Sequence, residues 1–184
     1  CFIAEGKLVV ERLLRSNREC RSLLVERGHH VELVELARNR NVPIEVLETD
    51  LATMRQIVGY DFHRGILACG IRPEMPDLCA LKAEEVAKGS PWIVACGVNN
   101  PENIGGLMRT AAAFGVTKMA ISHDVADPFS RRALRVSMAA ALRIEFWRFG
   151  NTEAACKHLS EVLGFRTLAT TLSPNSTPLA SFVA

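Results

Sequence analysis

Apolar positions in the second half of the chain alternate between two periodicities. Short continuous apolar runs predict four buried strands, at residues 92–98, 118–122, 144–149 and 166–171. Apolar residues spaced three and four positions apart predict helices between them, at residues 104–114, 128–142 and 152–163. Strands that alternate with helices favour a parallel sheet that is covered on both faces. We therefore expect an α/β unit in this half of the chain.

The beginning of the chain repeats this alternation on a smaller scale. Helical spacing occurs at residues 8–14, 31–36 and 51–57, and short apolar runs occur at residues 22–25, 44–47 and 65–70. Asp50 is placed to cap the third of these helices. The pattern predicts a compact αβα layer.

A segment of different composition separates the two units. Pro73, Pro76, Gly89 and Pro91 interrupt a charged stretch, which is typical of a linker with one or two helical turns at most. The chain therefore divides into three expected parts, residues 1–72, 73–91 and 92–184.

Composition and charge narrow the class of protein. Of the 184 residues, 48% are apolar and 23% are charged, as in globular proteins and unlike disordered or fibrous ones. The formal net charge is only +2, but residues 93–184 carry nine basic side chains against six acidic ones. Any nucleic-acid surface is therefore expected to be a local patch.

The cysteines and the uncharged segments indicate a cytoplasmic protein. Six cysteines are scattered without a CxxC pair, and several lie inside apolar runs, which indicates small buried side chains in a reducing compartment rather than a zinc site. The histidines are too dispersed to suggest a metal site or a catalytic triad. The longest uncharged stretch, residues 167–184, is broken by prolines, and charges interrupt the N-terminal apolar groups. We expect neither a membrane span nor a signal peptide.

Residues 97–115 (GVNNPENIGGLMRTAAAFG) hold the most informative polar groups. We expect Asn103 to cap the helix that follows the first strand, with Arg109 off its apolar face. The guanidinium of Arg109 then shares with Asn103 the space beyond the strand's carboxyl end, where open α/β sheets bind ligands. Gly105 and Gly106 leave room for another chain or a ligand to approach. On spacing alone, the alternative is an ordinary capped helix with a solvated arginine. Neither a GxGxxG nor a Walker motif is present, so a nucleotide-binding oxidoreductase is not indicated.

The same segment resembles the first signature of the SpoU/TrmH-type RNA ribose 2′-O-methyltransferases of the knotted SPOUT superfamily. The matching positions are Pro101, Asn103, Gly105, Arg109, Thr110 and Ala111. Two later stretches, residues 127–144 and 164–179, are similar to further family segments in the same order. Near the N-terminus, FIAEGKLVVERLL and FHRGILA resemble the small ribosomal-protein L30e-like substrate domain that many members carry.

The resemblance implies a fold and an activity. The fold is an L30e-like αβα domain followed by a parallel-sheet SPOUT domain. The activity is methyl transfer from S-adenosylmethionine to a ribose 2′-hydroxyl of ribosomal or transfer RNA by a homodimer, without metal. The resemblance implies that Arg109 and Asn103 are catalytic and that Thr170, Thr171 and Leu172 form one wall of the cofactor pocket. A guanidinium stays protonated in proteins, so stabilising the developing alkoxide suits Arg109 better than acting as a base.

Basic side chains suggest where RNA binds. Arg131, Arg132 and Arg135 belong to an arginine-rich stretch, and Arg131 and Arg135 share an exposed helical face that we expect Asp127 and Pro128 to begin. In the loop at residues 62–65, we expect Phe62 to stack on single-stranded RNA and His63 and Arg64 to grip it. The alternatives are a solvated helix face and an ordinary polar loop.

The sequence departs from the family at one place. Members continue with a Gly-Asn-Glu-Gly loop, an Ile-Pro-Met loop and a Ser-Leu-Asn helix, which form the trefoil knot and most of the cofactor pocket. None of these occurs here, and the chain does not begin with Met, so we expect a portion of a longer protein that lacks the knot segment. Alone, such a portion is expected to associate irregularly and to bind the cofactor weakly. The alternative function is a non-catalytic RNA-binding module that keeps the fold without the cofactor loops.

Overall fold

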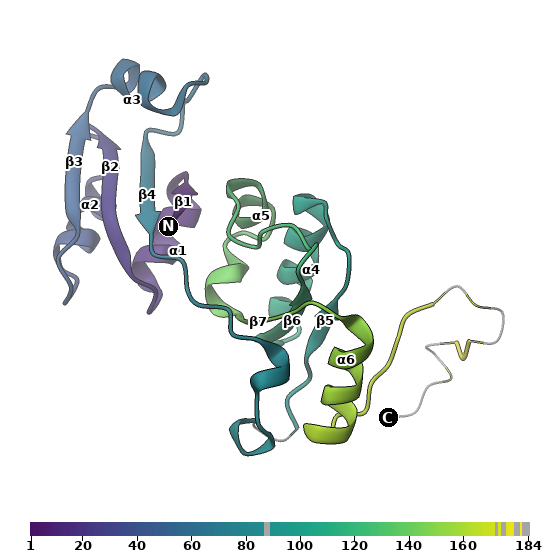
Figure 1. The fold of residues 1–184 in the computed structure, drawn as a ribbon. Coiled ribbons are helices and arrows are strands. Elements are labelled where there is room, and N and C mark those ends of the chain that lie inside the picture. Colours follow the sequence, from purple (N-terminus) through teal and green to yellow (C-terminus); the bar gives the residue numbers. More distant parts are fainter. Residues whose placement is uncertain (87–88, 172, 174–175, 179–180, 182–184) are drawn as a thin grey trace.

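The computed structural model describes the whole chain except residues 87–88, 172, 174–175, 179–180 and 182–184. It contains two separate sheets, of four and of three strands (Figure 1). Sheet A belongs to the N-terminal unit, and sheet B belongs to the unit that follows residue 91. In the described part of the chain, no helix is long and apolar enough to cross a membrane.

The N-terminal unit is a mixed sheet with three helices. The strand order is β1-β4-β2-β3, in which β2 pairs with β3 in parallel and β4 pairs antiparallel with both β1 and β2. The elements are β1 (Phe2–Glu5), α1 (Lys7–Arg15), β2 (Cys20–Glu26), α2 (Val31–Arg38), β3 (Glu45–Thr49), α3 (Leu51–Val58) and β4 (Ile66–Gly70). All three predicted helices and all three predicted strands are confirmed, and the Asp50 carboxylate caps α3 by accepting from the Thr53 N–H at 2.8 Å. Strand β1 was not predicted.

Sheet B is parallel, as predicted, with the strand order β5-β6-β7. Its elements are β5 (Ile93–Ala95), α4 (Pro101–Ala113), β6 (Lys118–Ser122), α5 (Arg131–Val136), β7 (Glu145–Phe149) and α6 (Thr152–Lys157), which a π-helical turn extends through residues 158–162. Along β6, Met119 and Ile121 pack with α4 and α5, whereas Ala120 packs with α6 on the opposite face. Both faces of the sheet are therefore covered, as a parallel sheet requires.

Helix α4 begins three residues earlier than the helix predicted over residues 104–114, and Asn103 is not its cap. The cap is Asn100, whose side-chain oxygen accepts from the Glu102 N–H at 2.8 Å. Pro101 explains the difference, since proline is favoured at the first helical position, where its missing N–H has no partner to lose. Asn103 therefore lies inside the first turn.

Helix α5 is much shorter than the predicted helix over residues 128–142. It begins at Arg131 with Ser130, not Asp127, as its cap, and Met138 and Ala139 adopt the left-handed conformation with φ of 52° and 62°. A helix cannot continue through such residues, so the chain reverses and resumes as a 3₁₀ turn at residues 140–143. The Ser137–Leu142 segment has high helix propensity, and packing overrides it: Ala139 to Leu142 are all buried.

The predicted strand at residues 166–171 is wrong. The described residues of this segment belong to neither sheet, and Leu168 is exposed. Figure 1 shows the described chain after α6 running away from sheet B. A strand is stable only when a neighbour completes its hydrogen bonds, and apolar character alone does not supply that neighbour.

The linker is bound to sheet B rather than loose. The Arg148 N–H in β7 donates to the Pro76 carbonyl at 2.8 Å, and Leu78 is fully buried beside Phe149. Two single 3₁₀ turns, at residues 78–80 and 83–85, match the one or two turns expected.

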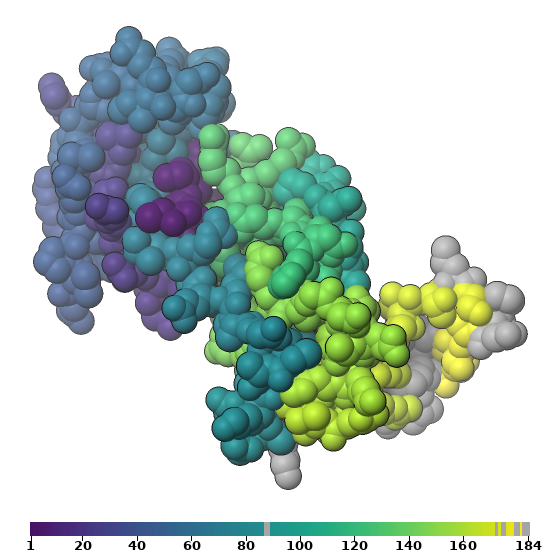
Figure 2. All heavy atoms as spheres, in the orientation of Figure 1, coloured from purple at the N-terminus to yellow at the C-terminus, as the bar shows by residue number. Residues whose placement is uncertain are grey.

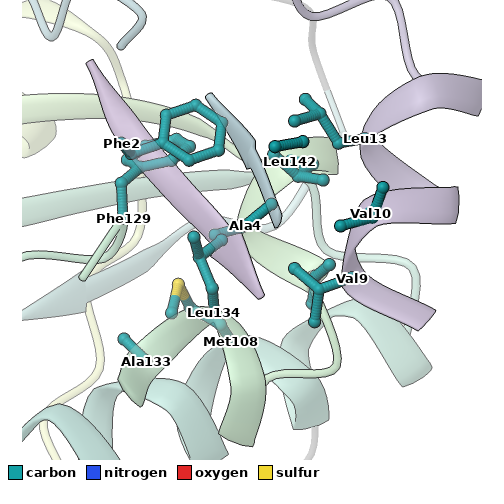
Figure 3. Close-up of a cluster of buried hydrophobic side chains, with 14 of the residues drawn as sticks. Phe2, Ala4, Val9, Val10, Leu13, Met108, Phe129, Ala133, Leu134 and Leu142 are labelled. Carbon is teal, nitrogen blue, oxygen red and sulfur yellow. The ribbon is translucent and has the colours of Figure 1, made fainter. Parts of the chain in front are cut away.

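The two units share one hydrophobic cluster. Figure 3 shows side chains of β1 and α1 packed against side chains of the second unit, and the rings of Phe2 and Phe129 lie 5.1 Å apart. Figure 2 shows the same contact as a broad face where purple and blue atoms meet green ones. Polar links border this cluster: Arg18 donates to the carbonyls of Leu142 (3.1 Å) and Ile144 (3.0 Å). The shared cluster fixes the N-terminal unit beside α4 and α5.

Candidate functional site

A cavity of about 670 Å³ lies where the two units meet. Its walls are the second half of α1, the C-terminal end of α4 and the segment of residues 137–143. Four arginines line it, and none of its lining residues is acidic: Arg12, Arg15, Arg109 and Arg143. The cavity is therefore strongly positive, in a protein whose net charge is close to zero.

Helix α4 presents Arg109 to this cavity. Ala112 and Ala113 follow at helical spacing and also line it, so small side chains leave the Arg109 guanidinium uncovered. Within the described residues, Arg109 is exposed and makes no hydrogen bond or ion pair. A free guanidinium offers five N–H donors and a permanent positive charge.

Asn103 and Arg109 do not share one space, contrary to the expectation. Asn103 is exposed at the start of α4 and does not line the cavity. Six helical residues separate the two, about 9 Å along the axis and roughly a third of a turn around it. Arg109 instead faces α1 and the 3₁₀ turn that precedes β7.

The carboxyl ends of β5 and β6 carry a polar cluster of their own. The Gly97 N–H donates to Ser122 Oγ at 3.0 Å, and Ser122 Oγ donates to the Asp124 carboxylate. That hydrogen bond is the main reason that the pKa of Asp124 lies below its usual range. Gly97 adopts a φ of +64°, a backbone conformation that is unfavourable for residues with a side chain. The cluster holds the two loops together.

Three of the predicted RNA-binding arginines converge on one buried carboxylate, that of Glu5 in β1. Arg131 donates to Glu5 Oε2 through Nε (3.1 Å) and Nη2 (2.7 Å), while Arg64 Nε and Arg135 Nη1 lie 3.2 Å and 3.9 Å from Oε1. Tyr60 also donates to Oε2, at 3.1 Å. We call these five residues the Glu5 cluster.

The Glu5 cluster is electrostatically unbalanced. Burial tends to raise the pKa of Glu5, but the hydrogen bonds and charges of Arg131, Tyr60 and Arg64 together outweigh it, so the pKa lies below its usual value. Only 6% of the Glu5 side chain is exposed, whereas Arg64, Arg131 and Arg135 are exposed by 39–47%. One carboxylate faces three guanidinium groups, which leaves the surface of the cluster positive.

The remaining predicted RNA-binding residues lie apart from one another. Arg132 pairs with Glu102 of α4, its Nε 3.0 Å from Oε1. His63 is exposed, but Phe62, expected to stack on RNA, is buried against Met54. Its aromatic face is therefore closed to a base.

The predicted cofactor residues lie in the irregular chain after α6. Thr170 and Thr171 are exposed, and Leu172 lies outside the described residues. Neither threonine lines the cavity at Arg109. Across the part of the chain that the structure describes, no three acidic, histidine or cysteine side chains gather as a metal site.

Sequence reasoning missed the arginines that surround Arg109. Arg12 and Arg15 are three residues apart and lie off the apolar face of α1, and Arg143 ends the 3₁₀ turn. The spacing of Arg12 and Arg15 indicates one polar helical face. That this face lies beside Arg109 depends on how the two units pack, which the sequence pattern does not indicate.

Comparison with known proteins agrees with this fold. Residues 90–183 match the model of the SpoU rRNA methylase family. Over 182 residues the chain is 34% identical to an uncharacterized tRNA/rRNA methyltransferase of Mycobacterium bovis, covering 99% of this chain and 61% of that protein. Over 154 residues it is 21% identical to a 23S rRNA (guanosine-2′-O-)-methyltransferase of Acinetobacter baylyi, covering 82% of this chain and 60% of that one.

A solved structure resembles the whole arrangement. The AdoMet-bound rRNA methyltransferase of Sinorhizobium meliloti superposes with a TM-score of 0.66 at 22% identity, covering 85% of this chain and 56% of that one. The likeness in structure concerns the fold. The chain spans about three fifths of the length of the curated relatives it matches.

Proposed function

The chain belongs to the SpoU rRNA methylase family, and from that premise we propose that the protein methylates a ribose 2′-hydroxyl of ribosomal or transfer RNA, with S-adenosylmethionine as the methyl donor. The observation that carries the proposal is the position of Arg109. The family motif places an uncovered guanidinium on the wall of a positive cavity between the two units. The 2′-O-ribose target draws support from the relative of Acinetobacter baylyi, whose name specifies guanosine-2′-O-methylation.

The proposed role of Arg109 is to stabilise charge. When bound, S-adenosylmethionine supplies an electrophilic methyl group. Transfer would form the bond from the 2′-oxygen to the methyl carbon as the bond from that carbon to the sulfonium sulfur breaks, and the hydroxyl proton would pass to solvent. Where the proton leaves ahead of the new bond, negative charge develops on the oxygen. Arg109 donates hydrogen bonds to it, and its permanent positive charge favours the transition state over the neutral hydroxyl. Asn103 is a second proposed contributor, at the beginning of α4, where the helix dipole also favours negative charge.

The proposal assigns residues to only one wall of the cofactor site. Thr170, Thr171 and Leu172 form that wall in the proposal, but the two threonines are exposed and enclose no pocket by themselves. No step is therefore derived for these residues beyond contact with the cofactor.

The proposed RNA surface extends from Arg109 over the N-terminal unit. Residues 1–72 are the proposed substrate domain, 73–91 the linker and 92–184 the methyltransferase domain. Arg64, Arg131 and Arg135 offer phosphates the excess positive charge of the Glu5 cluster, and His63 and Arg132 flank it. We place the protein in the cytoplasm with its RNA, and propose a homodimer as the active form.

Methylation with isotopically labelled S-adenosylmethionine tests this proposal. The protein is incubated with ribosomal and transfer RNA that lack modifications, and the products are digested to nucleosides for mass spectrometry. We expect label in 2′-O-methylnucleosides, at positions that become resistant to alkaline cleavage. Label in a base would contradict the ribose target. RNA binding without any methyl transfer would favour the non-catalytic RNA-binding module.

A further inference from the structure

The cavity at Arg109 carries more positive charge than one reacting hydroxyl needs. Arg12 and Arg15 come from the N-terminal unit, and Arg143 comes from the turn before β7. We propose that this cavity binds the phosphodiester backbone of single-stranded RNA, with Arg15 and Arg143 as its main phosphate contacts. The inference rests on the proposed function, because it places the substrate strand next to Arg109.

The arginines keep donors available for a phosphate. Arg143 is exposed and has no hydrogen bond or ion pair to any described residue. Arg15 uses only Nε, which donates to Glu11 at 3.0 Å, and 64% of its side chain is exposed. Arg12 donates from Nη1 to the Met138 carbonyl, and this hydrogen bond links α1 to the cavity wall. Arg143 thus offers its whole guanidinium and Arg15 offers its two Nη groups to the same space, and such groups match phosphate oxygens.

The rest of the lining favours a backbone over a base. Ala112, Ala113, Ala139 and Ala140 give the wall small side chains, and no aromatic residue is among those that line the cavity. Stacking, by which proteins hold unpaired bases, therefore has no platform here. The N–H groups of residues 138–140 already donate to carbonyls within the turn. The hydroxyls of Ser16 and Ser137 also donate to carbonyls of their own segments, so the arginine side chains and the Asn17 amide are left as donors.

The size and charge of the cavity favour single-stranded RNA over a double helix and over S-adenosylmethionine. A cavity of about 670 Å³ suits a small ligand or a short stretch of a single strand, and a double helix does not fit it. S-adenosylmethionine carries a sulfonium and an ammonium group against one carboxylate, so four arginines repel it more than they attract it. Single strands are also the usual targets of sequence-specific RNA recognition.

The test measures binding of a fluorescent single-stranded oligoribonucleotide of about ten nucleotides at several salt concentrations. We expect Arg15→Ala and Arg143→Ala each to weaken binding five- to twentyfold. Each substitution also lowers the slope of log K against log salt by about 0.7, the value for one lost phosphate contact on a single strand. Glu11→Gln releases Arg15 and is expected to tighten binding two- to threefold. In methylation assays, the two alanine variants raise KM and leave kcat within twofold.

Arg38→Ala is the matched control. Like Arg15, Arg38 is an exposed helical arginine paired with one glutamate, at 3.3 Å from Glu48, but it does not line the cavity. We expect it to bind RNA as the parent does. Parent-like affinity and slope for both Arg15→Ala and Arg143→Ala would overturn the inference even if the parent methylates RNA. Absence of methyl transfer with variant-sensitive RNA binding would instead overturn the proposed function alone.

Discussion

Arg131 of α5 holds the carboxylate of Glu5 in β1 through two hydrogen bonds, of 3.1 Å and 2.7 Å, across the boundary between the two units. The guanidinium also lies over the ring of Tyr60, 4.6 Å from its centre. Glu5 is buried while its three arginine neighbours are half-exposed, so the acid is the shared centre of the cluster. Orientation of the two units thus depends on this carboxylate as well as on the shared apolar cluster.

Replacing Glu5 by glutamine should destabilise the protein. Glutamine keeps the size of the side chain but leaves three guanidinium groups close together without their counter-charge. Breaking a buried ion pair costs about 3–5 kcal/mol, and exposure of the arginines reduces this, so we expect a loss of about 2–3 kcal/mol. Urea denaturation monitored by circular dichroism measures the change.

The matched control for this variant is Glu48→Gln. Glu48 also pairs with an arginine, Arg38, but both side chains are exposed, by 38% and 62%. Exposed pairs contribute about 0–1 kcal/mol, so the urea midpoint should barely move. Equal effects of the two substitutions would show that the Glu5 cluster adds no more than a surface pair.

The Glu5 cluster also predicts how stability depends on pH. Because the pKa of Glu5 is lower in the folded protein than its usual value, the unfolded state binds the proton more readily. The stabilisation is therefore complete above the usual pKa of a glutamate, near 4.3, and is lost as pH falls through the lower folded value. The difference in unfolding free energy between the parent and Glu5→Gln should shrink between pH 6 and pH about 3. A difference that stays constant over this range would contradict the role of the charge.

Local patterns predicted most of the fold. Strand β6 contains an apolar run buried on both faces, and β7 buries Phe146 on one face and Phe149 on the other. Helices α1 and α3 are amphipathic or capped, so neighbouring residues alone identify these four elements. Strand β1 was not predicted, because its four residues form a strand only by pairing with β4, which lies far away in the sequence. Phe2 pairs with Gly70 in β4, and its ring fills the space that a side chain at Gly70 would occupy.

The candidate site was predictable only in part. The spacing of the motif on α4 singled out Arg109, but the site around it needs α1, which lies about a hundred residues earlier in the chain. The helix expected over residues 128–142 ends at Val136, and the reversal that follows is what turns Arg143 toward the cavity. The exposed helical face of Arg131 and Arg135 was predicted correctly. Glu5, the carboxylate that these arginines pair with, belongs to β1, which was not predicted.

The two adjacent glycines of α4 should respond in opposite ways to alanine. A Cβ at Gly105 would lie 2.9 Å from Val136 Cβ and 3.1 Å from the Ala133 carbonyl oxygen, so α4 and α5 could not keep their present contact. We expect Gly105→Ala to cost about 1–3 kcal/mol. A Cβ at Gly106 meets nothing within 4 Å, so Gly106→Ala should stabilise α4 by about 0.5–1 kcal/mol. Thermal and urea unfolding of both variants measure these changes, and equal signs would contradict the close packing at Gly105.

Arg109→Ala should abolish methyl transfer and leave the fold intact. The side chain is exposed and makes no hydrogen bond or ion pair with a described residue, so the unfolding free energy should change by less than about 0.5 kcal/mol. Loss of one donor to a developing oxyanion lowers kcat by about 10²–10³, and we expect at least this reduction with labelled S-adenosylmethionine on the cognate RNA. Arg109→Lys should recover little, because an ammonium keeps the charge but lacks the planar fork. Arg38→Ala, which removes an exposed arginine elsewhere, serves as the control for kcat. Turnover of Arg109→Ala within threefold of the parent would show that the motif arginine has no role in the chemical step.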